Sequence, residues 1–429
     1  MTKTRKNTAA IIIMFLLFAM MSFVSGLQNP MGIIAKAQFG ASNAMSQMGV
    51  FMNFFAYLIF GIPAGFILKK RGYKISSLEA VSLGLVGVTI TFLSGVVANY
   101  WVYLLGALVS GFALCMLNTI VQPMLNTLGG GGNRGNQLVQ FGGSCNSMAA
   151  ALVPMLCGYL IGEVTAETQI KDVNIVLYIA MGIFALAFLI ILLSYIPEPE
   201  LEAAKAAAAN GETEKEGMME GIRKTLGYRN LVFGMIGIFV YVGAEVGISN
   251  IANLYMATPV EQGGLGILVG VAGTLCGVYW LLMLVGRILG GMVGGKVSSR
   301  SMLSIMGCAA IALLIVAIFF PKGITVGLLG QQVPVSVLLM ILCGLCTSVM
   351  SGAIFNMAVE GLGQYTSLAS GLINTMCVGG GVLLVALGAI SDKWGFVSSF
   401  WLIILCFIYL VWYALRGSKM GRKVKREEV

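Results

Sequence analysis

The chain has 429 residues, of which 58% are hydrophobic and only 10% are charged, and its formal net charge is +9. A soluble domain carries about 25% charged residues, so this composition excludes a water-soluble globular protein and favours one embedded in lipid. The sequence holds no histidine, which removes the commonest metal ligand and the commonest general base.

Long, continuous apolar stretches predict α-helices that cross a bilayer. A helix needs about 20 apolar residues to cross the hydrocarbon core, and a membrane β-barrel would instead show alternation with a period of two. We therefore predict an all-α polytopic membrane protein with twelve spans. They are residues 8–26 (continuing, less apolar, to 30), 47–68, 75–97, 101–128, 137–162, 173–196, 230–256, 265–293, 302–320, 333–359, 365–390 and 396–415.

A polar segment divides these spans into two groups of six. The predicted organisation is an N-terminal half over 1–197, a cytoplasmic linker over 198–229, a C-terminal half over 230–416 and a basic tail over 417–429. The first apolar run follows three cations, as in a signal peptide, but it is too long for one and lacks a convincing small-residue cleavage site. We interpret it as the first span.

Positive charge falls mainly on one side of the predicted membrane, at the ends of the hydrophobic runs. With both termini in the cytoplasm, the opposite side holds only Lys36, Lys171, Lys322 and Lys393. Because cytoplasmic loops carry the excess of Lys and Arg, we predict an integral membrane protein with both termini cytoplasmic; the resemblance given below implies that this membrane is the bacterial inner membrane. The net positive charge thus indicates the lipid bilayer, and not nucleic acid, as its partner.

Glycines four residues apart recur at matching places in the two halves. Gly61 and Gly65 precede Lys69, Lys70 and Arg71 after the second span, and Gly286, Gly290 and Gly294 precede Lys296 after the eighth. Such spacing lets helices approach closely in lipid. The duplication favours a transporter whose halves rock about a central site over a membrane protein with small-residue packing and no transport role. The predicted gating residues are Gly65, Lys69, Arg71, Gly290 and Arg300.

One acidic side chain lies deep inside a predicted span. Glu245 is about fifteen residues into the seventh span, or roughly 22 Å along a helix, and the sequence places no basic residue at a comparable depth. On that basis we expect no salt bridge. A carboxyl in hydrocarbon is costly and usually functional, so Glu245 is the candidate ion-coupling residue. The alternative is a protonated carboxyl that joins neighbouring helices.

Amide side chains are also concentrated within the spans. Asn and Gln offer both donors and acceptors, which suits a neutral polyhydroxylated ligand such as a sugar; the alternative is hydrogen bonding between helices. Tyr57, Tyr241 and Tyr279 could stack on a sugar ring. The predicted substrate-binding residues are Gln28, Asn29, Asn53, Asn118, Gln122, Gln140, Asn146, Asn250, Trp280, Asn356 and Asn374.

Catalytic motifs find no support in the sequence. No phosphate-binding Gly-Lys-Ser/Thr follows the glycines at 129–132, which we interpret as a turn, and no histidine can activate a nucleophile. Cys343 and Cys346 have CxxC spacing but lie inside a predicted span, where small buried hydrophobes are the better interpretation. We predict no enzyme activity, no cofactor and no metal site.

Three stretches resemble the fucose permease and glucose/galactose transporter branch of the major facilitator superfamily. They are Val242-Gly-Ala-Glu-Val-Gly-Ile, Glu360-Gly-Leu-Gly-Gln-Tyr-Thr and Asn136-Gln-Leu-Val-Gln-Phe, and the turn over 65–74 also fits. The resemblance implies a twelve-helix fold of two pseudo-symmetric halves and a monomer. It also implies alternating-access transport of a hexose or deoxyhexose by a sugar symporter or a facilitator.

Two departures from that branch concern coupling. The resemblance implies acids before the proline that ends the first span and early in the Pro123 stretch of the fourth, where this chain has Asn29 and Asn118. Amides do not titrate, so coupling by the usual pair is not expected. A proton on Glu245, sodium coupling and facilitated diffusion stay open. So do a different small solute (a polyol, an amino sugar or a nucleoside) and a non-transporting sensor.

Overall fold

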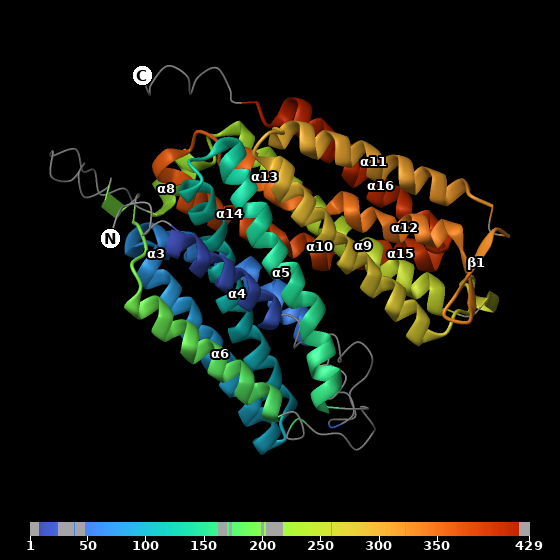
Figure 1. Ribbon diagram of the computed structural model, residues 1–429, viewed down its shortest axis with the longest axis horizontal. Helices are drawn as coiled ribbons and strands as arrows, with labels where there is room; N and C mark the ends of the chain where they lie inside the picture. The colour runs from blue at the N-terminus through green and yellow to red at the C-terminus, as the bar shows by residue number, and fades with distance from the viewer. Residues whose placement is uncertain are drawn as a thin grey trace. The chain divides into compact units, whose positions relative to one another are not determined.

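The computed structural model describes residues 8–24, 38, 48–161, 170, 174–198, 201–202, 218–258, 260–321 and 323–419, and these are predominantly helical (Figure 1). The helices of the first half of the sequence are Thr8–Val24, α3 (Met48–Val97), α4 (Tyr100–Leu128), α5 (Gly132–Ile161) and α6 (Asn174–Leu193). Helix α3 contains two predicted spans joined at Gly72, so this half supplies all six.

The second half supplies the remaining six spans. Its helices are α8 (Met218–Thr225) in the linker, α9 (Arg229–Ala257), α10 (Val269–Gly294), α11 (Ser299–Phe319), α12 (Val335–Thr347), α13 (Met350–Ala358), α14 (Thr366–Thr375), α15 (Gly379–Trp394) and α16 (Phe396–Trp412). Short helical turns are η2 (Val260–Gln262), η3 (Gly363–Tyr365), η4 (Met376–Val378) and η5 (Tyr413–Gly417). The twelve-span prediction and the all-α fold class are confirmed.

The chain forms two compact units, and each draws on both halves of the sequence. The first unit comprises Met1–Gly130, Cys145–Gly227 and Gly361–Met376; the second comprises Gly131–Ser144, Tyr228–Glu360 and Cys377–Val429. The first unit therefore includes α14 from the second half, and the second unit includes the start of α5 from the first half. The division into two halves with a linker stays a prediction about which parts move together.

A tight turn inside α3 organises the first unit. Gly72 has φ of 78°, which a residue without a Cβ adopts easily, and it redirects the chain between two spans. The Glu198 carboxylate then accepts hydrogen bonds from the backbone nitrogens of Tyr73 (2.6 Å) and Lys74 (2.7 Å). These nitrogens begin the next helix and have no partner within it. Helix α3 packs against α4, α6 and α14.

Helix α9 lies at the centre of the second unit, in contact with α10, α12, α13, α15 and α16. Two spans predicted as continuous are interrupted. The tenth span breaks between α12 and α13, where Thr347 and Ser348 hydroxyls bond the carbonyls of Gly344 and Leu345; such local bonds compete with helix geometry. The eleventh changes to a 3₁₀ turn, η4, between α14 and α15.

Two further differences concern loops. The connection between α11 and α12 holds an unpredicted antiparallel hairpin, β1 (Thr325–Leu328) with β2 (Gln331–Pro334), in which Leu328 pairs with Gln331. Its two turn residues, Leu329 (φ 52°) and Gly330 (φ 75°), both have positive φ, as tight hairpin turns require. Helix α5 already begins at Gly132, so the predicted loop after the glycines is shorter than expected.

Candidate functional site

A row of polar side chains crosses the first unit from α3 to α4. The Asn118 side-chain amide donates to the Tyr57 hydroxyl (3.4 Å), and the Gln122 amide donates to the Asn118 carbonyl (2.7 Å). Asn118 and Gln122 are one turn apart and therefore share a face of α4; all three residues are partly exposed. We call Tyr57, Asn118 and Gln122 the amide row.

Asn53 lies one helical turn before Tyr57. Its side chain is 8% exposed, and its Oδ1 has no hydrogen-bond partner among the residues the structure describes. A buried acceptor without a donor is costly, and this oxygen lies close to Gly111 of α4; a role for Asn53 in binding stays a prediction. The amide row and Asn53 together offer donors and acceptors of the kind that sugar hydroxyls use.

Four other predicted binding residues of the first unit are not part of the amide row as the structure describes it. Asn146 accepts a hydrogen bond from Ser22 (2.6 Å), which joins α5 to helix Thr8–Val24. Asn374 on α14 is buried and donates to the Thr119 hydroxyl (3.0 Å). Gln28 and Asn29 lie outside the described residues. The binding roles of these four residues remain predictions.

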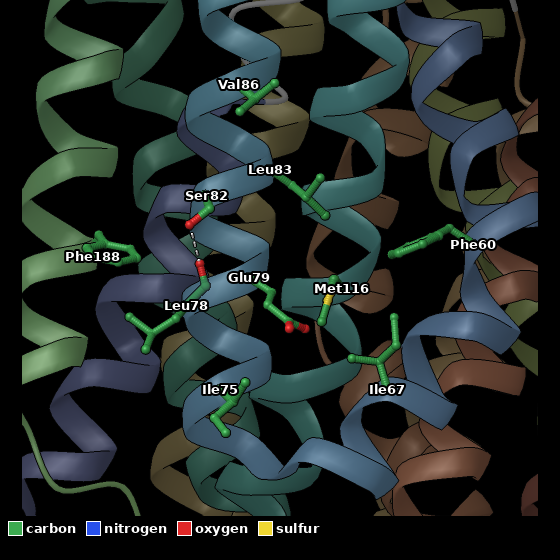
Figure 2. A pocket seen from close by; sticks show the side chains of 10 residues that line it. All are labelled: Phe60, Ile67, Ile75, Leu78, Glu79, Ser82, Leu83, Val86, Met116 and Phe188. Atoms are coloured by element: carbon green, nitrogen blue, oxygen red, sulfur yellow. Dashed lines mark hydrogen bonds between the residues drawn. The ribbon is translucent and has the colours of Figure 1, made fainter.

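One hollow in the described part of the first unit is unsuited to a sugar. This groove has a volume of about 500 Å³ and its lining is almost entirely apolar, with Phe60, Met116 and Phe188 among its ten residues (Figure 2). Glu79 is the only carboxylate drawn there, and it pairs with Arg71. A groove of this character on a membrane helix suits hydrocarbon chains, so we do not assign substrate to it.

In the second unit the expectation that Glu245 has no basic partner is wrong. Arg287 Nη2 lies 3.6 Å from Glu245 Oε1, and the two side chains are 11% and 12% exposed. The expectation rested on the depth of each residue's backbone along its span, without the direction of its side chain. Side chains of a helix lean toward its N-terminus, and consecutive spans run in opposite directions. Arg287, seven residues from the end of α10, therefore reaches toward Glu245, which leans back toward it.

Arg287 also holds two backbone carbonyls. Its Nη1 donates to Gly143 O on α5 (3.0 Å), and its Nε donates to Ser348 O, at the break between α12 and α13 (3.2 Å). One guanidinium thus joins α5, α9, α10 and the interrupted tenth span. The sequence signal for this residue was available, since Arg287 is a cation well inside a predicted span; its partners were not.

Aromatic and amide side chains surround this ion pair to different degrees. Tyr279 donates to the Glu245 backbone carbonyl (3.0 Å) and bonds the Thr347 hydroxyl (3.1 Å). Trp280 is partly exposed, with its ring at 90° to that of Tyr279. Asn250 is exposed and donates to the Val246 carbonyl (2.9 Å) of its own helix.

Two predicted binding amides of the second unit are satisfied by protein partners. Gln140 is 2% exposed and donates to Val349 O (2.8 Å). Asn356 donates to Ser299 Oγ (2.7 Å) and to Gly132 O (3.1 Å). Gln140 thus joins α5 to the N-terminal end of α13, and Asn356 joins α13 to the starts of α5 and α11. This is the interhelical role that the sequence left open, and a binding role for either residue stays a prediction.

Glycines of α3 and α14 form a tight contact in the first unit, which we call the first clamp. A Cβ built at Gly371 would lie 2.8 Å from the Gly65 Cα, and one at Gly65 would lie 2.9 Å from the Ser367 carbonyl. Nearby, the Lys69 ammonium lies 5.1 Å from the centre of the Tyr365 ring. The first clamp therefore joins span two to span eleven through backbone-to-backbone packing.

Glycines of α10 approach α5 in the second unit, which we call the second clamp. A Cβ at Gly294 would lie 3.3 Å from the Gln137 Cα, and one at Gly291 would lie 2.7 Å from the Phe141 ring. Gly290 faces Val349 and Gln140. Beyond α10, Arg300 pairs with Glu360 (3.1 Å) and donates to the Ser418 hydroxyl. The second clamp joins span eight to span five.

These features define the class of the protein. Apolar spans cross the bilayer, polar groups face one another within each unit, and paired glycine contacts join the two sequence halves at equivalent helices. That combination is the architecture of a helical membrane transporter, and not of an enzyme.

The chain belongs to the major facilitator superfamily, whose family model matches residues 13–386. It is 29% identical over 424 residues to a glucose/galactose transporter of Brucella abortus, covering 97% of this chain and 96% of the relative. It is 23% identical to the L-fucose-proton symporter of Escherichia coli, covering 96% and 94%. The crystal structure of the Escherichia coli fucose:proton symporter shares the fold, with a TM-score of 0.80 at 20% identity over 96% of this chain and all of that one.

Proposed function

We propose that this protein carries a neutral hexose or deoxyhexose across the bacterial inner membrane by alternating access. The observation that carries the proposal is the amide row, with the unpaired Asn53 oxygen beside it. The relatives named as glucose/galactose transporters and as an L-fucose-proton symporter support the same substrate class. Asn250 and Trp280 of the second unit stay candidate substrate-binding residues.

Coupling to protons through Glu245 forms the second part of the proposal. The relative named as a proton symporter supports this ion, and Asn118 stands where the resemblance implies an acid. Glu245, 12% exposed beside Arg287, is then our candidate for the coupling carboxyl. We further propose a monomer with both termini in the cytoplasm, in which the two clamps close and open the cytoplasmic end.

Uptake of a labelled hexose panel into proteoliposomes tests the proposal, with proton and sodium gradients imposed separately. We expect accumulation with a proton gradient alone. Accumulation with sodium alone, or equilibration that ignores both gradients, would overturn the coupling. Transport of polyols or nucleosides without competition by hexoses would overturn the substrate class.

Asn118→Ala sharpens the assignment of the amide row. Loss of one hydrogen bond to a neutral ligand is worth about 0.5–1.5 kcal/mol, so we expect the KM for hexose to rise about 2- to 10-fold. Thr89→Ala is the matched control, since the Thr89 hydroxyl bonds the Leu85 carbonyl of its own helix. An unchanged KM in Asn118→Ala would remove this residue from the site.

A further inference from the structure

Three acceptors on different elements lie near the Arg287 guanidinium in the described part of the chain, at unequal distances. Its two carbonyl bonds, to Gly143 and Ser348, measure 3.0 and 3.2 Å, whereas its nearest contact with the Glu245 carboxylate measures 3.6 Å. Charge-assisted bonds between N–H and carboxylate are normally 2.7–2.9 Å long. The ion pair is therefore incomplete while the carbonyls hold the guanidinium.

The geometry of the guanidinium explains why the contact between Arg287 and Glu245 is long. Its donors lie in one plane at fixed angles, so a bond from Nη1 to α5 and a bond from Nε to Ser348 together fix the direction in which Nη2 points. The Glu245 Oε1 atom lies 3.6 Å from Nη2, beyond hydrogen-bond length. Release of either carbonyl would allow the plane to turn toward the carboxylate.

The bond to Gly143 depends on the second clamp. Gly143 lacks a Cβ, and one built there would lie 3.3 Å from Arg287 Cδ, so glycine lets the arginine reach the backbone of α5. This carbonyl is available to Arg287 only while α5 lies against α10. The contact that closes the second clamp is therefore also the contact that competes with Glu245 for the guanidinium.

We propose that Arg287 is the proton-release residue for Glu245, and that separation of α5 from α10 triggers the release. With the clamp closed, Gly143 holds Nη1 and Glu245 can keep its proton. When α5 departs, Nη1 loses the Gly143 carbonyl and Arg287 turns to the carboxyl. The O–H bond of Glu245 breaks, its electron pair stays on the carboxylate, and the proton passes to water. This inference rests on the proposed proton coupling.

Few other charged or titratable groups surround Glu245 in the described part of the chain. Tyr241 on α9, Tyr279 on α10 and Cys377 in η4 interact with it electrostatically. The elements packed on α9 also bring Cys276 (α10), Cys343 and Cys346 (α12), Asp392 and Lys393 (α15), Cys406 and Tyr409 (α16), and Tyr413 and Arg416 (η5), while α13 has none. Arg287 alone among the interacting groups carries a positive charge, so it is the group able to stabilise the ionised carboxylate.

The test follows the infrared band of the protonated Glu245 carboxyl against pH in purified protein, with Glu245→Gln used to assign the band. An opposite charge at 4–6 Å shifts the ionisation of a carboxyl by about 1–3 pH units. We expect Arg287→Gln to move the loss of the band to higher pH by an amount in this range. Gly143→Ala crowds Arg287 away from α5, and we expect it to move the loss to lower pH.

The two substitutions should move the pH at which the band is lost in opposite directions, and a merely structural role of Arg287 would not give that result. Lys224→Gln is the control, since Lys224 forms an exposed pair with Glu220 in α8. Displacement in the same direction by both substitutions, or no displacement by Gly143→Ala, would overturn the proposal. Gly143→Ala leaves both charges in place, so the test holds even where Arg287→Gln fails to fold.

A transport assay separates this inference from the proposed function. In Arg287→Gln we expect hexose exchange to continue while proton-driven accumulation falls at least about tenfold, because exchange needs no proton release. If wild-type protein moves no hexose, the proposed function fails, and the infrared test still decides the role of Arg287. Full accumulation by Arg287→Gln would overturn the inference while leaving sugar transport intact.

Discussion

The two clamps are built at equivalent helices and use different chemistry. The first joins α3 to α14 through glycine backbones, with neutral hydrogen bonds such as Ser370 to the Thr119 carbonyl (2.9 Å) and with Lys69 over the Tyr365 ring at one end. The second joins α10 to α5 through glycines that face side chains and through Arg287, whose guanidinium also pairs with the Glu245 carboxylate. The backbone packing of the first clamp responds to the size of the residues in it, whereas the contact of Arg287 can also respond to protonation of Glu245. The two halves therefore share the glycine pattern, and the second clamp adds a link to a titratable carboxyl.

The largest predicted effect breaks the first clamp. Gly371→Ala places a Cβ 2.8 Å from the Gly65 Cα, and backbone on both sides cannot yield. Overpacking of this kind costs about 1–3 kcal/mol, which we expect to see as lower thermal stability in detergent together with slower transport.

Two glycines serve as comparisons for that variant. Gly388→Ala on α15 meets nothing within 4 Å and should leave stability unchanged. Gly290→Ala in the second clamp meets the Val349 side chain and the end of Gln140, which can move, so its effect should be smaller than that of Gly371→Ala. Equal effects at Gly371 and Gly388 would show that the first clamp is not tightly packed.

A double-mutant cycle measures a neutral hydrogen bond between α14 and α4, beside the first clamp. Asn374 donates to the Thr119 hydroxyl, and both side chains are buried. Combining Asn374→Ala with Thr119→Ala should give a coupling energy of about 0.5–1.5 kcal/mol, read from thermal stability at several pH values. Because neither group titrates, a coupling that varied with pH would contradict the contrast between the clamps.

The smallest predicted effect concerns the exposed ion pair of the second unit. Arg300 and Glu360 are 41% and 46% exposed, and pairs of this kind contribute about 0–1 kcal/mol. Arg300→Gln should therefore lower thermal stability slightly, and less so at high salt. A larger loss of thermal stability, independent of salt, would indicate that the hydrogen bonds of Arg300 to Ser418, and not the ion pair, stabilise this contact.

The spans were predictable because hydrocarbon thickness fixes their length. Their recurring spacing singled out Gly65, Gly290 and Gly294, but it did not reveal Gly371 or Gly291, which also take part in the close contacts. Helix α9 illustrates the agreement, since the predicted span 230–256 matches Arg229–Ala257. Contacts between side chains were harder to predict from the sequence. The Glu245–Arg287 pair was missed because side-chain direction was not added to backbone depth, although both residues were visible in the sequence.

Other features depend on information that a periodicity does not hold. The break at Ser348 arises from hydroxyl bonds to preceding carbonyls, and an apolar pattern continues through it unchanged. The amides could not be sorted from sequence, because Gln140 and Asn118 are the same kind of group in the same kind of span. Only the structure shows Gln140 bonded to Val349 O while Asn118 lies in the partly exposed amide row.

The turn at Gly72 has a consequence for how the sequence can evolve. A Cβ at position 72 would run into the Glu198 carboxylate, and that carboxylate holds the backbone nitrogens that follow the turn. A mutation at either position therefore removes the reason for the residue at the other. Among homologous chains the two positions should covary, so that a descendant with a side chain at 72 has also lost the acid at 198.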